Sequence, residues 1–351
     1  MAKRRASEKA PRTPAEDGFS MPAEWSPHAG CLISWPCREP TWHGHFEDAK
    51  RAYTAVIEAI DRFDPVTILA DPATAQEARR RLGPGARIIE AALDDSWARD
   101  NGPIFLWRGD NTVALANFRF NGWGHKQPHE KDDALPLQLA ERLRTRRYDA
   151  PMVLEGGAIS VDGDGTLLTT EQCLLNVNRN PGMSREEIEQ VLTSYLGIRK
   201  VIWLPRGVED DMTDGHVDGV AGFVMPRVVL AAHTKDDSDP NFRTLEKNLA
   251  RLESATDAKG RPLEVVRMVQ PRPIRVGEVP VTPSYVNLYF SNGAVVFPKY
   301  GIREDDIARE TLESLFPERE IVGVRCEHIG IGGGDVHCIT QQLPAGEPLY
   351  P

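Results

Sequence analysis

From about residue 95 onward, apolar and polar positions follow two alternating periods. Pairs of short apolar runs separated by a polar turn predict β-hairpins, and the stretches after them, apolar at every third or fourth position, predict helices. A further short apolar run closes each segment and predicts a strand. The unit of hairpin, helix and strand occurs four times. The hairpins are predicted at 103–107/112–118, 158–161/166–170, 220–224/228–232 and 286–290/294–297, and the closing strands at 152–154, 200–204, 263–269 and 320–324. The helices are predicted at 134–148, from 184 onward, at 241–255 and at 304–316, and residues 184–187 form a capping-box sequence.

The two ends of the chain complement each other. The first part predicts strands at 32–36, 66–70 and 87–91 and helices at 46–63 and 74–82, but no hairpin; the last predicted strand, 338–342, has no helix of its own. Repeated units of this kind stack on one another, and pairing of the first and last strands would close the stack. The pattern therefore favours an α/β propeller of five ββαβ modules around a central channel over an ordinary α+β fold with repeated hairpins.

The N-terminal segment, the lengths of the apolar runs and the net charge limit the class of protein. Residues 1–18 begin with basic residues at positions 3–5 but have no apolar stretch behind them, so we expect a disordered tail and not a secretory signal, which leaves 19–351 as one catalytic domain. No apolar run approaches the ~18 residues of a membrane span. Acidic residues outnumber Lys and Arg by 52 to 42, which argues against a nucleic-acid partner and suits a small cationic substrate. We expect a cytoplasmic protein with no membrane partner; the sequence leaves homo-oligomer formation open.

Thiol chemistry is also constrained by the count and spacing of cysteines. The five cysteines are sparse and contain no C-x-x-C pair, which argues against a disulfide framework and a structural zinc site. One of them, Cys338, follows three glycines and an acid at residues 332–335. Glycines let backbone N–H groups approach a sulfur closely, which would lower the pKa of the thiol and favour a nucleophilic thiolate. The alternative is an inert cysteine in a glycine-rich turn. Cys31 and Cys173 are expected to be catalytically silent.

Polar, glycine-containing junctions precede the predicted hairpins. In stacked modules, equivalent junctions meet at one end of the axis, so their side chains would converge despite their separation in sequence. Each has a simple structural explanation when taken alone: a turn acid, a loop acid, a hydrogen-bonded histidine with its partner, and a buried thiol. Together they supply a nucleophile, a base and three carboxylates: Cys338, His216, Asp100, Glu155 and Asp218.

Such a set suits attack on a flat cation with several N–H donors. Carboxylates bind a guanidinium through paired hydrogen bonds, so Asp100 and Asp218 would hold its central carbon opposite the sulfur. His216 would protonate departing ammonia and activate water. A metal hydrolase is the competing hypothesis. It is disfavoured because His216 and Asp218 are two positions apart and the remaining candidate histidines, His125, His233 and His328, lack metal-ligand spacing.

Six stretches in order along the chain carry a resemblance to a known family: 21–25 (MPAEW), 97–103 (WARDNGP), 120–124 (FNGWG), 154–157 (LEGG), 213–218 (TDGHVD) and 332–344 (GGGDVHCITQQLP). They span roughly residues 20–348. On these residues the chain resembles the agmatine deiminases and, more broadly, the bacterial peptidyl-arginine-deiminase-type group of the guanidine-modifying, or pentein, superfamily.

The resemblance implies a five-bladed α/β propeller that hydrolyses the guanidine of agmatine, a step in putrescine biosynthesis and polyamine metabolism. The products would be N-carbamoylputrescine and ammonia, formed through a covalent amidino-cysteine intermediate without a metal or an organic cofactor. It also implies site roles by position: Cys338 as nucleophile, His216 as general acid and base with Glu155 beside it, Asp100 and Asp218 as guanidinium clamps, and Trp97 as a wall of the substrate channel.

One departure concerns the far end of the substrate. Agmatine-specific members often carry an acid just before the threonine of the histidine motif, where this chain has Met212, preceded by Asp210 and Asp211. Free arginine or a peptidyl arginine therefore remains an alternative substrate. The sequence also leaves open an amidinotransferase that uses the same covalent intermediate, and a non-catalytic member of the superfamily.

Overall fold

The computed structural model describes residues 12–349, whose strands form five sheets of three or four strands and one two-stranded sheet. Four of the five larger sheets contain an antiparallel hairpin followed by a parallel strand from the same segment of the chain. Their strands are β4 (Ile104–Arg108), β5 (Thr112–Arg119) and β6 (Arg147–Val153); β7 (Ile159–Val161), β8 (Thr166–Thr170) and β9 (Lys200–Leu204); β10 (Ala221–Met225), β11 (Val228–His233) and β12 (Glu264–Val269); and β15 (Tyr289–Ser291), β16 (Ala294–Lys299) and β17 (Glu320–Arg325).

The fifth large sheet joins the two ends of the chain. Strand β1 (His28–Ser34) runs antiparallel to β18 (Thr340–Pro344), with Ile33 opposite Thr340, and parallel to β2 (Val66–Ala70). This confirms the predicted pairing of the first and last strands. Strand β3 (Arg87–Glu90) extends the sheet beyond β2. The chain ends therefore complete a hairpin and a parallel strand that neither end contains alone.

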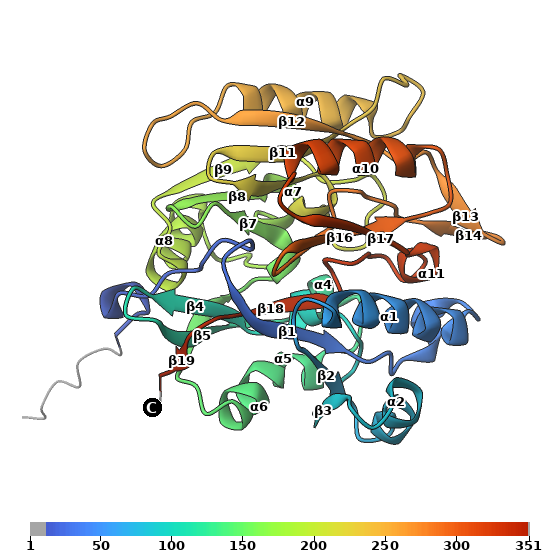
Figure 1. Ribbon diagram of the computed structural model, residues 1–351. Helices are drawn as coiled ribbons and strands as arrows, with labels where there is room; N and C mark the ends of the chain where they lie inside the picture. Colours follow the sequence, from blue (N-terminus) through green and yellow to red (C-terminus); the bar gives the residue numbers. More distant parts are fainter. Residues whose placement is uncertain (1–11, 350–351) are drawn as a thin grey trace, which may run out of the picture.

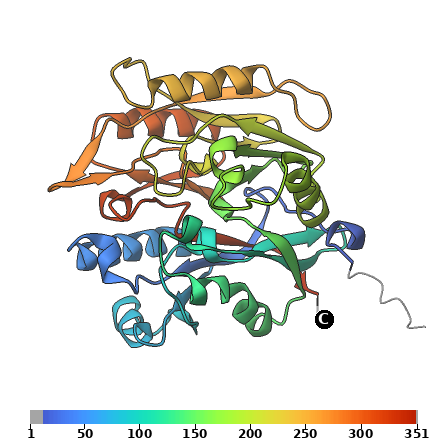
Figure 2. The same cartoon turned by 180° about the vertical axis from the view of Figure 1, so that it is seen from behind.

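Amphipathic helices lie on the outside of the strands (Figures 1 and 2). Five helices each connect the second strand of a hairpin to the following parallel strand: α1 (Phe46–Asp61), α6 (Leu135–Arg142), α8 (Arg185–Leu196), α9 (Phe242–Glu253) and α10 (Glu304–Leu315). Helix α9 buries Leu245, Leu249 and Leu252 along one stripe against β11 and β12, as its apolar spacing predicts. Ser184 is the N-cap of helix α8 and forms the predicted capping box with Glu187.

Short helical turns precede three of the hairpins and lie against one another. They are α3 (Ala98–Asn101), η3 (Gly156–Ala158) and η4 (Val217–Gly219), and η3 contacts both of the others. The loop before β18 adjoins the same place, since α3 also contacts β18. The remaining elements are η1 (Ala15–Asp17), η2 (Glu39–Trp42), α2 (Ala75–Leu82), α4 (Gly122–His125), α5 (Glu130–Asp133), α7 (Glu171–Leu174), β13 (Ile274–Val276), β14 (Val279–Val281), α11 (Glu327–Gly330) and β19 (Glu347–Pro348).

The structure corrects some element boundaries. The helix predicted at 134–148 ends at Arg142 because Arg144 takes a left-handed backbone conformation, and β6 already begins at Arg147. Burial alternates along the first part of β6, as in a strand with one face in the core. The hairpin of β13 and β14 was not predicted, since prolines in and around it obscure the strand signal.

The expected tail at residues 1–18 is too long at its carboxyl end. Residues 1–11 lie outside the described part of the chain, but Ala15–Asp17 form η1. The hydroxyl of Tyr148 donates a hydrogen bond to the Asp17 carboxylate at 2.7 Å, and Arg146 pairs with it at 3.0 Å. These contacts attach residue 17 to β6 and its preceding turn.

Between residues 12 and 349, every helix is too short or too polar to cross a lipid bilayer.

Candidate active site

Three predicted site residues converge on Gly157. A Cβ atom added to this glycine would lie 2.6 Å from His216 Nδ1, 2.8 Å from Asp100 Oδ1 and 2.9 Å from Asp218 Oδ2. Such distances are shorter than van der Waals contact, so the three side chains can pack together only over a residue without a side chain. Cys338 Sγ lies 3.6 Å from Asp218 Oδ2. The predicted meeting of distant junctions is confirmed for these four residues.

Cys338 sits in the loop between α11 and β18, and its side chain is almost entirely buried. Its sulfur accepts a hydrogen bond from Nδ2 of Asn287 at 3.1 Å. A Cβ on Gly334 would lie 2.8 Å from this sulfur and 2.7 Å from the ring of Trp97. Gly334 thus lets the loop pass between the thiol and the indole.

The electrostatic environment of the thiol differs from the prediction. Burial raises the pKa of Cys338 well above its usual range, and the nearby carboxylates of Asp218 and Asp100 raise it further. The backbone amide of Asp335 opposes this shift but does not overcome it. The expectation that glycine amides lower the pKa of this thiol is wrong for the unliganded protein, because burial and two anions outweigh them.

Asp100 is held by donors from two neighbouring loops. Trp123 Nε1 donates to Oδ2 at 2.9 Å, and the Gly157 amide donates to Oδ1 at 3.0 Å. Trp123 lies in α4 with a left-handed backbone (φ 56°), a strained conformation for a tryptophan that directs its indole toward the carboxylate. Burial, followed by the charges of Asp218 and Glu155, raises the pKa of Asp100 to about 6.

Asp218 has a different partner. Its Oδ2 lies 2.8 Å from Nδ1 of His337, the residue directly before the cysteine. Burial alone would raise the pKa of Asp218, but the hydrogen bond and the charge of His337 outweigh it and lower the pKa. The two aspartates therefore differ: the pKa of Asp218 is lowered, whereas that of Asp100 is raised to about 6.

His216 has free hydrogen-bonding capacity. Within residues 12–349, neither of its ring nitrogens has a hydrogen-bond partner, although the ring is buried and Nδ1 lies 3.8 Å from Asp100 Oδ1. Burial favours the neutral ring, but Asp100, Cys173 and Glu155 together raise the pKa of His216 well above its usual value. A buried polar group without a partner is unusual, and the thiol of Cys173 is a close neighbour of this ring.

Glu155 lies beside His216, but the described structure has no hydrogen bond between them. Its Oε1 accepts from Nε of Arg179 at 2.6 Å, and both side chains are fully buried. Arg179 also donates to the backbone oxygen of Thr213 at 2.7 Å, which fixes the loop that carries His216. Glu155 is thus part of the site through an ion pair that the sequence did not indicate.

Two groups of side chains in the described part of the chain bring three metal-ligating atoms within 4.8 Å of one another. One is Glu155, Cys173 and His216; the other is the partly exposed set of His45, Asp48 and His328. In the first, the guanidinium of Arg179 already supplies a positive charge to Glu155, which disfavours a second cation there. The same group places Cys173 beside His216. The thiol that we expect to be catalytically silent is therefore close to the site.

A cavity of about 380 Å³ lies next to the site, since its wall includes Trp123, which donates to Asp100. Trp97 forms part of its wall and stacks on Trp42 at 5.7 Å between ring centroids. The backbone of Gly332 and Gly333 and the carboxylates of Asp95 and Asp210 also line the cavity. Trp123 and Met212 supply apolar surface.

Five side chains that contact the site were not assigned a role from the sequence: Trp123, Asn287, His337, Glu24 and Arg179. Three of them lie in stretches that carried the family resemblance, which was the available signal. Asn287 and Arg179 lie outside those stretches, and only the fold brings them to the site.

Comparison with known proteins gives a consistent result. The sequence profile of the Porphyromonas-type peptidyl-arginine deiminase family matches residues 20–344. The agmatine deiminase of Pseudomonas aeruginosa (strain UCBPP-PA14) is 43% identical over 358 aligned residues, which cover 95% of this chain and 97% of that protein.

Solved structures extend the similarity to the fold. The agmatine deiminase of Enterococcus faecalis superposes with a TM-score of 0.92 at 35% identity, covering 97% of this chain and all of that one. A cysteine-to-serine variant of the C. jejuni agmatine deiminase with substrate bound superposes with a TM-score of 0.86 at 26% identity, covering 94% and 97% of the two chains.

The charge environment of the thiol predicts its reactivity. Asp218→Asn removes a carboxylate 3.6 Å from the sulfur, so the pKa of Cys338 should fall and its alkylation by iodoacetamide at pH 8 should accelerate several-fold. The site of modification is followed by peptide mass spectrometry, with Cys338→Ser as the blank. Asp64→Asn, at a buried carboxylate paired with His28, is the matched control and should leave the rate unchanged. Equal or slower alkylation in Asp218→Asn would contradict the assigned cause of the raised pKa.

Proposed function

The chain belongs to the Porphyromonas-type peptidyl-arginine deiminase family, and we propose that it is an agmatine deiminase, hydrolysing agmatine to N-carbamoylputrescine and ammonia. The observation that carries this proposal is the convergence of two carboxylates, an unpartnered imidazole and a thiol around Gly157. A guanidinium offers the flat array of N–H donors that two carboxylates can hold. The near full-length similarity to agmatine deiminases supports this reaction.

The first half of the reaction forms a bond from sulfur to carbon. Asp100 and Asp218 bind the guanidinium, and its positive charge offsets the field that keeps Cys338 protonated. The thiol then gives its proton to solvent, and the thiolate attacks the guanidinium carbon. His216, held as an imidazolium by the surrounding acids, gives a proton to the departing nitrogen. Ammonia leaves, and an amidino group remains on Cys338.

The second half of the reaction releases the product. The neutral imidazole of His216 takes a proton from a water molecule, and the resulting hydroxide adds to the amidino carbon. The carbon–sulfur bond breaks, so the thiol is regenerated and the ureido product leaves. Both halves need the ring nitrogens of His216 to be free, which agrees with their lack of a partner within residues 12–349. Glu155 contributes to the negative field that keeps the ring protonated.

The entrance cavity supports a substrate with a cationic chain. Trp97 and Trp123 provide flat apolar walls, on which methylene groups pack well. Asp210 supplies a carboxylate for a terminal ammonium, although Met212 stands where related enzymes often have an acid. Asp95 lies in the same wall, but it is buried, accepts a hydrogen bond from Thr41 at 2.6 Å and lies 3.9 Å from Nε of Arg38, which brings a positive charge to the cavity. The choice of agmatine over arginine therefore rests on the similarity to agmatine deiminases.

We also propose that the five large sheets form pseudo-symmetric modules around a central channel, as in penteins. The end-to-end pairing of β1 with β18 supports this arrangement. Residues 19–351 would then be one catalytic domain, working in the cytoplasm on a small guanidino substrate.

Replacing the nucleophile separates binding from chemistry. Cys338→Ser should lower the ureido product to background, because a hydroxyl at this site is a far weaker nucleophile, while agmatine binding by calorimetry persists. Cys31→Ala, at a buried thiol in β1, is the matched control and should retain turnover. Normal turnover in Cys338→Ser would refute the role given to the sulfur.

A panel of guanidines tests the substrate. Agmatine, arginine and an arginyl peptide are compared by kcat/KM for ureido product, and agmatine should be preferred at least tenfold. Adding a primary amine should not divert the product to a new guanidine. A preference for arginine or the peptide would overturn the substrate, and amine-dependent transfer would indicate an amidinotransferase.

A further inference from the structure

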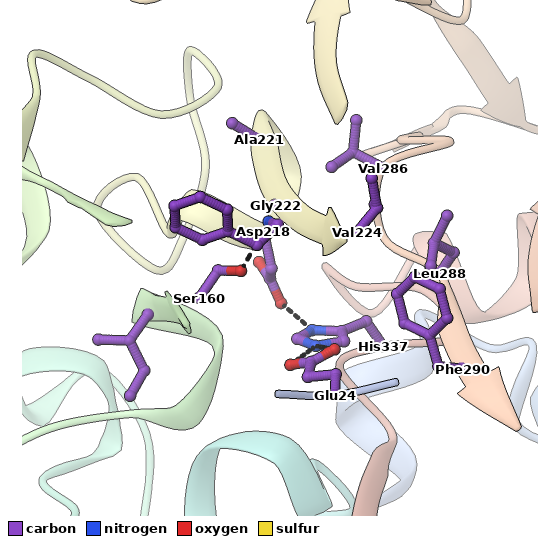
Figure 3. A pocket seen from close by; sticks show the side chains of 12 residues that line it. Glu24, Ser160, Asp218, Ala221, Gly222, Val224, Val286, Leu288, Phe290 and His337 are labelled. Carbon is purple, nitrogen blue, oxygen red and sulfur yellow. Dashed lines mark hydrogen bonds and ion pairs between the residues drawn. The ribbon is translucent and has the colours of Figure 1, made fainter. Parts of the chain in front are cut away.

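Behind Asp218, the imidazole of His337 lies between two carboxylates (Figure 3). Nδ1 is 2.8 Å from Asp218 Oδ2, while Nε2 is 2.8 Å from Glu24 Oε1 and 3.1 Å from Oε2. Glu24 precedes β1, Asp218 lies in η4 and His337 precedes the nucleophile, so the three residues join separate parts of the chain.

This geometry requires a doubly protonated ring. A neutral imidazole donates from one nitrogen only, whereas both nitrogens here face carboxylate oxygens. The carboxylates outweigh burial and the charge of Arg99, and the pKa of His337 rises. The ring and Arg99 in turn lower the pKa of Glu24 to about 2, against the effect of burial. The unit therefore holds two anions and two cations.

The three side chains of this unit are buried. They share a cavity of about 20 Å³, room for about one water molecule, with the apolar side chains of Val286, Leu288 and Phe290 (Figure 3). Hydrogen bonds between ions are stronger in such a medium than in water. The unit is therefore a rigid support for Asp218.

We propose that His337 and Glu24 are positioning residues, and that the imidazolium clamped between Glu24 and Asp218 fixes the Asp218 carboxylate as an oriented anion facing the Cys338 sulfur. Asp218 is thereby ready to receive the guanidinium before substrate arrives. Asp100 has only neutral donors, Trp123 and Gly157, at hydrogen-bond distance within the described part of the chain. The two clamps of the proposed reaction thus differ: Asp218 is a fixed anion, and Asp100 completes the clamp when the cation binds.

The positioning of Asp218 by the His337 imidazolium should depend on pH. The charged groups that face His337 are Glu24 from the segment before β1, Asp218 from η4 and Arg99 from α3, with the Cys338 thiol next to it in sequence. A cation held by anions is present below its pKa and is lost as pH rises through it. Glu24→Gln removes one of the anions, so the imidazolium should be lost at lower pH.

The state of the ring is measured without any turnover. In protein labelled with ¹³C at histidine Cε1, the His337 resonance, assigned by its absence from His337→Asn, should show an imidazolium at pH 7.5. In Glu24→Gln the same resonance should titrate at lower pH. A neutral His337 ring in the unmodified protein at pH 7.5 would overturn the proposal.

Kinetics test the positioning role, which rests on the proposed function. The amide nitrogen of asparagine falls near Nδ1 of histidine, and that of glutamine near Nε2. His337→Asn therefore keeps a donor to Asp218, while His337→Gln keeps one only to Glu24. His337→Gln should lower kcat/KM for agmatine roughly 10- to 100-fold, as is usual when the support of a binding group is removed. His337→Asn should recover most of this loss, and equal losses in both variants would contradict the positioning role.

The pH profile separates positioning from folding. In the unmodified protein, loss of the His216 imidazolium also contributes an alkaline limb to kcat/KM. In Glu24→Gln the limb should move to lower pH, to the pH at which the His337 resonance titrates in the same variant. Asp257→Asn removes another buried carboxylate, which pairs with Arg261 at 2.6 Å, and should lower thermal stability without moving that limb. An unshifted limb in Glu24→Gln would refute the proposal. Failure of the unmodified protein to act on agmatine would refute only the proposed substrate, because the resonance of His337 is read in the free protein.

Discussion

Repulsion between two buried carboxylates and a nearby sulfur is the interaction on which the site depends. Asp100 and Asp218 add to the effect of burial in raising the pKa of Cys338, so the unliganded protein holds a protected thiol instead of a reactive thiolate. A flat cation between the carboxylates reverses the sign of this local field. In the proposed reaction, the carboxylates that bind the substrate therefore also activate the nucleophile, and the sulfur becomes reactive only when a guanidinium is in place.

The fold makes this arrangement possible by placing glycines where the charged side chains and the sulfur come together. Gly157 lets His216 and the two aspartates meet, and Gly334 lets the loop before β18 pass the sulfur. Pairing of β18 with β1 fixes that loop, although Cys338 comes more than a hundred residues after Asp218. Support for the charges lies one layer deeper, where Arg179 holds Glu155 and His337 holds Asp218.

Much of this was accessible from the sequence, and the misses have physical causes. Strand and helix periods located the hairpins and the long helices, and equivalent junctions identified the residues that converge. The helix expected to continue to residue 148 stopped early because a left-handed residue at Arg144 interrupts a pattern that periodicity alone reads as continuous. Arg179 and Asn287 were missed because only tertiary packing chooses such partners. The pKa of the thiol was misjudged because glycine amides are visible in the sequence, whereas the distance from the sulfur to a carboxylate is not.

The central claim is that a bound cation converts Cys338 into a thiolate. Its direct test is the ultraviolet absorbance of the thiolate, titrated with pH in the presence and absence of an amidinium analogue of agmatine that releases no ammonia, with Cys338→Ser as the blank. The account predicts that the pKa of Cys338 falls when the cation binds. A pKa that stays unchanged or rises in the complex would contradict it.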